Sequence, residues 1–247
     1  QVYRNLKANH SLSTTYLGDS YYAGTKLSND FAACGANYWT DCTVWQITNS
    51  HEIALVSRGK AKLITADYII IATGAIERAM PVRGWTLPGV MSVGGAQTLL
   101  KQAALGADEA VFVGSGPLLY LTVWQYIKAG LSVRAVIDTT GRSQWLSALA
   151  FAPLAFLQPN MLAMGQKWLR EIRQKVDVIT NVEGVEIVGR SQVEALSYTR
   201  SAGGKIDLTG KHVVLYRGVM PNIKLSMESG CEQRLDRNTS YRKPGTE

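Results

Sequence analysis

The residues best suited to specific chemistry are two glycines within Val111-Phe112-Val113-Gly114-Ser115-Gly116-Pro117-Leu118-Leu119. An apolar run with β propensity precedes the glycines, and an apolar, helix-compatible run follows them as far as Ala129. Gly114 permits a sharp turn, and Gly116 lets backbone N–H groups approach a phosphate at the positive end of a helix. The spacing therefore predicts a strand, a dinucleotide-binding turn and a helix. The residues expected to face the nucleotide are Gly114, Ser115, Gly116, Pro117 and Leu118.

Asp138 supports the same interpretation from further along the chain. It ends a second apolar run, residues 133–137, and stands twenty-two residues beyond Gly116. Dinucleotide-binding folds place an acid at about this distance, where it accepts hydrogen bonds from a ribose. Leu119 occupies the position where the usual fingerprint has a third small residue. The alternative is that the Rossmann-like fold persists while Leu119 tightens the site against pyrophosphate and Asp138 is a solvated strand end.

Other kinds of site find little support in the sequence. The cysteines form no C-x-x-C pair, and the histidines show no metal-binding spacing. We therefore predict no metal site, a reducing cytoplasmic setting and no catalytic nucleophile, base or dithiol in the chain. The residues concerned are Cys34, Cys42, Cys231, His10, His51 and His212.

Charge and hydropathy limit the partners of this 247-residue chain. The net charge of +7 is scattered, without a recognised nucleic-acid motif, so we expect a solvated surface and no nucleic acid. The most apolar stretch, residues 145–157, is broken by Pro153 and is too short to span a membrane. Residues 145–164 carry no charge, which predicts either a docking surface for a partner subunit, with self-association of the isolated chain, or a helix covered within the same chain.

Apolar periodicity predicts the remaining elements. The fold class expected from them is α/β, a parallel Rossmann-like sheet followed by an antiparallel meander, with a polar, frayed end over residues 234–247. Helices are predicted at 25–34, 92–105 and much of 144–175, and strands at 38–47, 53–57, 60–65, 68–75, 177–180, 182–188, 192–199, 205–208 and 212–216. The strand at 68–75 is continuously apolar, as in strands buried on both faces of a sheet.

Five segments together resemble one family. They are Gln1-Val2-Tyr3-Arg4, Ala72-Thr73-Gly74-Ala75-Ile76-Glu77-Arg78, Gly84-Trp85-Thr86-Leu87-Pro88-Gly89-Val90, Gly114-Ser115-Gly116-Pro117-Leu118-Leu119 and Gly218-Val219-Met220-Pro221-Asn222. In order and spacing they resemble the pyridine-nucleotide-disulfide oxidoreductase superfamily. The branch is that of the A (alpha) subunits of opine oxidases, hydroxyproline dehydrogenases and hydrogen cyanide synthase.

The resemblance implies a nested organisation, in which an FAD-binding domain is split around an NAD(P)-type domain. It implies a partial FAD-type domain with a domain connection at residues 1–90, the NAD(P)-type Rossmann domain at 91–217, and a return segment to the FAD-type domain with a tail at 218–247. Ala72, Thr73 and Gly74 would lie against FAD, and the turn around Gly114 with Asp138 would face a second nucleotide. The family also carries leucine at the Leu119 position.

The family resemblance also implies a function. Members of this branch are flavin-dependent oxidoreductase subunits that pass electrons from amine or opine-type substrates and work with a second (beta) flavoprotein subunit. The family's first phosphate-binding loop and its later Gly-Asp motif are absent, so we expect a fragment, truncated at both ends, that has lost FAD and is inactive by itself. The alternative function is a non-catalytic nucleotide-binding or subunit-assembly module.

Overall fold

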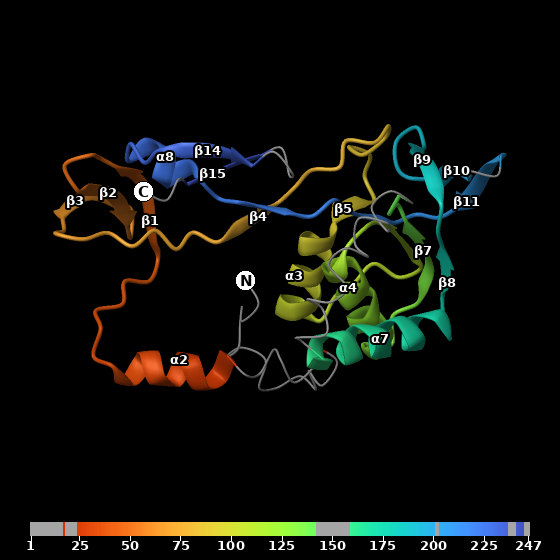
Figure 1. Cartoon of the computed structure of the whole chain (residues 1–247), viewed down its shortest axis with the longest axis horizontal. Helices are drawn as coiled ribbons and strands as arrows, with labels where there is room; N and C mark the ends of the chain where they lie inside the picture. The colour runs from red at the N-terminus through yellow and green to blue at the C-terminus, as the bar shows by residue number, and fades with distance from the viewer. Residues whose placement is uncertain (1–16, 18–23, 142–158, 201–202, 237–240, 245–247) are drawn as a thin grey trace. The chain divides into compact units, whose positions relative to one another are not determined.

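The computed structural model of the chain describes residues 17, 24–141, 159–200, 203–236 and 241–244 (Figure 1). These residues divide between two compact units. The first unit comprises residues 26–76 and those from Val219 onward, and the second comprises Glu77–Gly218 together with Leu17. The divisions thus fall after Ile76 and Gly218, whereas the sequence analysis places them after residues 90 and 217.

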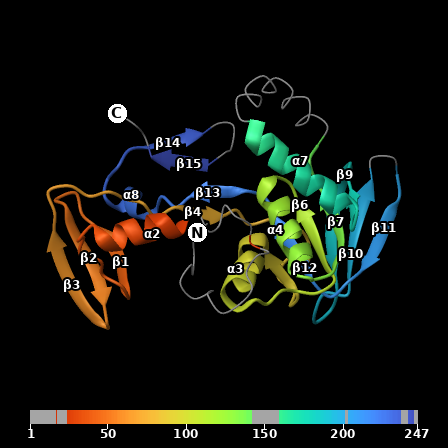
Figure 2. The same cartoon turned by 90° about the horizontal axis from the view of Figure 1, so that it is seen from below.

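The second unit is built on a five-stranded sheet whose strands are all parallel, in the order β5-β12-β6-β7-β8 (Figure 2). Strands β6, β7 and β8 follow one another outward, and β12 lies on the other side of β6, so the strand order reverses between β6 and β12. In open α/β sheets, ligands bind at the carboxyl ends of strands at such a reversal. The predicted Rossmann-like parallel sheet is confirmed. The strands are β5 Val90–Ser92, β6 Ala110–Gly114, β7 Val133–Asp138, β8 Asp177–Ile179 and β12 Val213–Tyr216.

Three helices cover one face of this sheet. Their buried residues form one core cluster with alternate residues of the strands, among them Phe112, Val136 and Val214. The apolar faces of the helices therefore account for one side of each strand. The helices are α3 Val93–Ala103, α4 Pro117–Lys128 and α7 Pro159–Arg173.

The antiparallel meander β11-β10-β9 covers the other face, as predicted. Val111 and Val113 of β6, which point away from the helices, pack in a second core cluster with Ile187 and Leu196 of the meander. The second unit is thus a three-layer structure of helices, parallel sheet and meander, which buries β6 completely. The meander strands are β9 Val182–Val188, β10 Ala195–Arg200 and β11 Lys205–Thr209.

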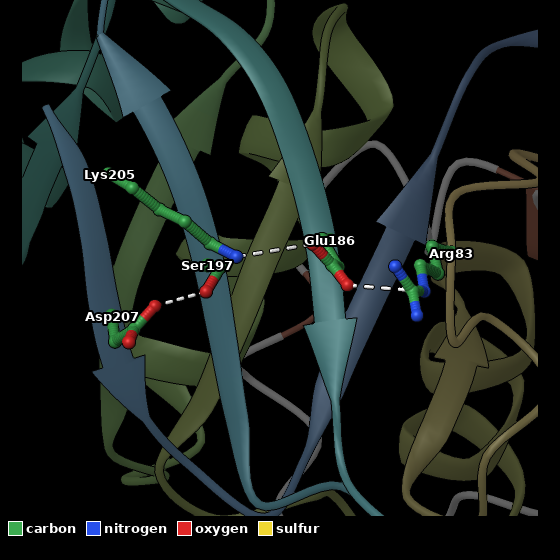
Figure 3. A network of polar contacts seen from close by, with 5 residues as sticks. All are labelled: Arg83, Glu186, Ser197, Lys205 and Asp207. Atoms are coloured by element: carbon green, nitrogen blue, oxygen red, sulfur yellow. Dashed lines mark hydrogen bonds and ion pairs between the residues drawn. The ribbon is translucent and has the colours of Figure 1, made fainter. Parts of the chain in front are cut away.

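A row of polar side chains crosses the outer face of the meander (Figure 3). Ser197 pairs in register with Glu186 on one side and with Asp207 on the other, and its hydroxyl donates to Asp207. Glu186 forms ion pairs with Arg83 (3.2 Å) and Lys205 (3.3 Å). Partly exposed pairs of this kind contribute at most about 1 kcal/mol each, so they support the register more than the stability.

The chain crosses β9 closely at Gly84. Ile187 N donates to Arg83 O at 2.8 Å, and Gly84 has φ +81°. A Cβ atom at Gly84 would lie 2.1 Å from Ile187 O. Only glycine fits both the backbone conformation and the contact.

Helices α4 and α7 are joined by a polar contact at the edge of their shared core. Glu171 Oε2 accepts a hydrogen bond from Trp124 Nε1 (2.9 Å) and forms an ion pair with Lys128 Nζ (2.8 Å). The bond from Lys128, followed by that from Trp124, lowers the pKa of the Glu171 carboxyl below its ordinary value. The ionised carboxylate therefore favours the folded state.

The first unit contains short antiparallel sheets. Strands β2 and β3 form the predicted hairpin, with Arg58 (φ 48°) and Gly59 (φ 74°) at its tip as a type I′ turn requires. The helix expected at residues 25–34 is confirmed as α2. The elements are α2 Gly24–Ala33, β1 Cys42–Ile47, β2 Glu52–Ser57, β3 Lys60–Thr65, β4 Ala75–Glu77, β13 Val219–Pro221, α8 Lys224–Glu228, β14 Gln233–Asp236 and β15 Tyr241–Pro244.

The predicted strand at residues 68–75 is wrong for all but its last residue. Residues 68–74 form no strand, and Tyr68 and Ile70 are 91% and 92% exposed. Apolar β-branched residues favour a strand because they pack in a sheet, and no described strand lies beside this run until β13 pairs with β4. Without such a neighbour, the backbone hydrogen bonds of a strand are missing.

The predicted fraying of residues 234–247 is also wrong in part. Strands β14 and β15 form an antiparallel pair, and Lys243 Nζ lies 3.3 Å from Asp236 Oδ2 across it. Cross-strand pairing of this kind can order a polar segment that has little apolar periodicity.

The uncharged stretch at 145–164 falls mostly on residues 142–158, which lie outside the described residues. In its described part, Met161, Leu162 and Met164 on the first turns of α7 are exposed, Met161 by 63%. Docking of a partner at this stretch stays a prediction. Among the described helices, none is long and apolar enough to cross a bilayer.

We expect Gly84→Ala to lower the free energy of unfolding of the second unit by about 1 kcal/mol more than Gly130→Ala does. The two glycines have nearly equal φ angles, +81° and +80°, but a Cβ at Gly130 has nothing within 4 Å. The difference therefore isolates the clash with Ile187 O. Urea unfolding of both variants measures it, and equal losses would show that β9 can move away.

We expect the stabilisation by Glu171 to depend on pH. Because the pKa of its carboxyl is lowered in the folded state, the contribution is present above the unfolded pKa and is lost as pH falls through the folded value, between about pH 5 and 3. Glu171→Gln should be less stable than the wild type at pH 6, and the two should converge near pH 3. Lys128→Met should reduce the same pH dependence. Parallel stability curves for Glu171→Gln and wild type would contradict this account.

Candidate functional site

The turn between β6 and α4 is shaped by the neighbouring strand β12. Gly114 has φ +144°, and a Cβ there would lie 1.9 Å from Tyr216 O. Gly116 has φ +110°, and its Cβ would lie 3.4 Å from the ring of Tyr216. Both glycines of the motif are thus required, one by a close backbone approach and both by their conformation. The turn lies at the point where the strand order reverses.

The N-terminus of α4 is open to an anion. Pro117 is the first helical residue, Gly116 provides no side-chain cap, and the first turn carries no acidic residue. In contrast, the N-terminus of α3 is satisfied within the chain, because Ser92 Oγ accepts from Gly95 N (3.2 Å) and Glu77 Oε2 accepts from Gly94 N (2.7 Å). Uncapped N–H groups at the positive end of a twelve-residue helix favour a phosphate.

A cavity of about 470 Å³ opens beside this turn at the carboxyl ends of the strands. Ser115 follows β6, Thr139 follows β7 and Arg217 follows β12, and all three line the cavity. Its other lining residues are Arg78, Met80, Pro81, Val82, Val182, Glu183 and Val185. Two guanidinium groups against one carboxylate make the lining cationic, which suits a diphosphate.

The sequence analysis did not single out Arg78 and Arg217 as site residues. Arg217 comes directly after a predicted strand of the parallel sheet, and in an open α/β sheet that position lies at the binding edge. This signal was available for Arg217. Arg78 lies on the connection before β5, and its place beside the cavity depends on tertiary structure.

Asp138 ends β7 opposite Gly114, as predicted, but its carboxylate is bonded within the chain. The residue is 6% exposed, so it is not a solvated strand end. Oδ1 accepts from Thr140 N (2.8 Å) and Thr140 Oγ1 (2.5 Å), and Oδ2 accepts from the hydroxyl of Tyr120. Burial, with the bond to Asp138 as the next cause, raises the pKa of Tyr120 well above its ordinary value. The sequence analysis overlooked Tyr120, which lies directly after the motif.

Leu119 does not project into the turn. Its side chain is fully buried in the core between the helices and the sheet, with Phe112 and Val123. Leu119 therefore serves the packing of α4 on the sheet, and it is absent from the residues that line the cavity.

Ala72, Thr73 and Gly74, the residues expected against FAD, lie together in the first unit. They are exposed, and they are held to the segment after β13 by two hydrogen bonds. Thr73 Oγ1 donates to Asn222 O (2.8 Å), and Asn222 N donates to Gly74 O (3.0 Å). Two of the motifs quoted in the sequence analysis thus meet in space, while the turn around Gly114 belongs to the other unit.

The part of the chain that the structure describes contains no cluster of three or more His, Cys, Asp or Glu side chains that could hold a metal ion. The three cysteines are free. The candidate site is therefore the glycine turn with its cationic cavity.

Comparison with protein families matches residues 29–240 to the family described as pyridine nucleotide-disulphide oxidoreductase. The chain is 35% identical over 241 residues to the A (alpha) subunit of opine oxidase from Agrobacterium tumefaciens (strain Ach5), covering 94% of this chain and 48% of the relative. It is 34% identical over 142 residues to hydrogen cyanide synthase subunit HcnB of Pseudomonas aeruginosa, covering 56% of this chain and 30% of the relative. The chain spans about half the length of the opine oxidase subunits that it matches.

Solved structures show the same fold. An NAD-dependent persulfide reductase from A. fulgidus matches with a TM-score of 0.57 at 22% identity, over 83% of this chain and 36% of that chain. A thioredoxin reductase from T. acidophilum matches with a TM-score of 0.57 at 20% identity, over 94% of this chain and 71% of that chain. At these identities the likeness concerns the fold.

Proposed function

The chain belongs to the pyridine nucleotide-disulphide oxidoreductase family, and from this premise we propose that its second unit binds a nicotinamide dinucleotide at the turn between β6 and α4. The observation that carries the proposal is the glycine turn itself. It combines an uncapped helix N-terminus with a cationic cavity at the reversal of strand order.

The proposed roles follow from the residue types. The backbone N–H groups around Gly114, Ser115, Gly116, Pro117 and Leu118 receive the pyrophosphate, and Arg217 neutralises its charge. Asp138 is the acceptor for the adenosine ribose, within the limits that its contact with Tyr120 sets. When bound, the nicotinamide supplies hydride chemistry, and the chain's own residues bind and orient it.

The whole protein is proposed to be an oxidoreductase subunit that passes electrons from an amine or opine-type substrate. Relatives at 35% identity are named as the A (alpha) subunits of opine oxidases, and these names favour a complex with a second, flavoprotein subunit. The free cysteines suit a reducing, cytoplasmic setting. The alternative, a non-catalytic assembly module, has no observation in its favour.

FAD is the proposed cofactor of the whole protein, at Ala72, Thr73 and Gly74. These residues are exposed, and an exposed segment of three residues offers few contacts to a flavin. The 247-residue chain is therefore proposed to hold FAD too weakly for purification.

We expect Arg217→Gln to weaken NAD binding roughly tenfold, because a charge-assisted bond to phosphate is worth about 1.5–3 kcal/mol. Arg134→Gln is the matched control. Arg134 lies on β7 in the same unit, donates to Thr209 (3.1 Å), and is not among the residues that line the cavity. Calorimetric titration measures both, and equal affinities for Arg217→Gln and wild type would contradict the cavity's role.

We expect the purified 247-residue chain to show no flavin absorbance in the near ultraviolet and visible after gel filtration. The measurement is one spectrum, with and without prior incubation in excess FAD. A flavin band that survives the column would mean that the segment at Ala72 holds more of the cofactor than its exposure indicates.

A further inference from the structure

The acid expected to bind ribose is already engaged on both of its oxygens. Oδ1 of Asp138 is fixed by the backbone N–H and hydroxyl of Thr140, and Oδ2 receives the hydroxyl of Tyr120 from the first turns of α4. Asp138 is also 6% exposed. A ribose that bonds the acid must therefore meet it at Oδ2, where Tyr120 already donates.

The tyrosine cannot give way by losing its proton. Burial and the bond to Asp138 raise the pKa of Tyr120 well above its ordinary value, so the hydroxyl stays a donor at physiological pH. The carboxylate cannot simply rotate either, because the backbone bond from Thr140 N holds Oδ1 in place. The competition between Tyr120 and a ribose hydroxyl is thus confined to one oxygen atom.

We propose that Tyr120 is a specificity-determining residue of the nucleotide site, whose hydroxyl competes with the ribose hydroxyl for Oδ2 of Asp138. This proposal rests on the function proposed above. It implies that the turn and the cavity recognise the diphosphate, while the ribose contributes little until the Tyr120 hydroxyl is displaced. The wild type should therefore bind NAD weakly and should draw little benefit from its acid.

The test is a double-mutant cycle by calorimetric titration of the full chain with NAD. Tyr120→Phe removes one oxygen atom and leaves the ring, and we expect it to tighten NAD binding roughly threefold to tenfold, the value of one hydrogen bond. In the wild-type background, Asp138→Asn should change the affinity by less than about twofold, whereas in the Tyr120→Phe background it should remove the gain.

Tyr126→Phe is the matched control. Tyr126 lies on the same helix but is buried against Phe112 in the core, so loss of its hydroxyl should leave NAD affinity unchanged. Urea unfolding checks that every variant is folded, and Tyr120→Leu replaces Tyr120→Phe if the latter is not.

The outcomes separate the two proposals. If the wild type binds NAD and Tyr120→Phe binds it equally or more weakly, the competition is overturned and the site stands. If neither binds NAD, both the competition and the proposed nucleotide site are overturned. If Tyr120→Phe gains affinity and keeps the gain without the acid, Tyr120 acts by obstructing the site, and the competition for Oδ2 is overturned.

Discussion

The close approach of β12 to β6 at Gly114 is the contact on which the second unit depends. Tyr216 O occupies the space where a Cβ of residue 114 would lie, so the first glycine of the motif serves strand packing as well as the turn. β12 comes from a part of the chain about a hundred residues later, after the meander has formed the layer opposite the helices. Its insertion between β5 and β6 creates the reversal of strand order and brings Arg217 to the cavity. Sheet assembly and site formation therefore share one contact.

Alternation along β6 explains how one strand supports two cores. Phe112 faces the helices, whereas Val111 and Val113 face the meander, so a continuously apolar run is what a doubly covered strand requires. The same composition at residues 68–74 has a different outcome, because no described strand lies beside that run. Apolar content predicts that a strand will be buried if a sheet is present, and the presence of the sheet is decided elsewhere in the chain.

The sequence predicted best those features that a few adjacent residues determine. The hairpin at Arg58-Gly59 needs two positive φ angles, and the β6 turn needs two glycines, so local chemistry was sufficient for both. Asp138 was correctly placed at the end of β7, opposite Gly114. Its bonding partner was not foreseen, because the Tyr120 hydroxyl reaches it from a helix eighteen residues earlier in the chain. The pairing of β14 with β15 was missed because polar strands leave no apolar pattern.

Recognition of the two halves of a dinucleotide draws on different parts of this site. The pyrophosphate would meet backbone N–H groups and arginines, and the backbone groups persist whatever side chains follow the turn. The ribose would meet one carboxylate, whose availability depends on which side chain the first turn of α4 directs at it. A tyrosine at position 120 can therefore alter ribose recognition without disturbing the turn, since Leu119 beside it already secures α4 to the sheet. Fold and phosphate recognition are thus separable from nucleotide specificity, and the two can change independently among proteins that share this turn.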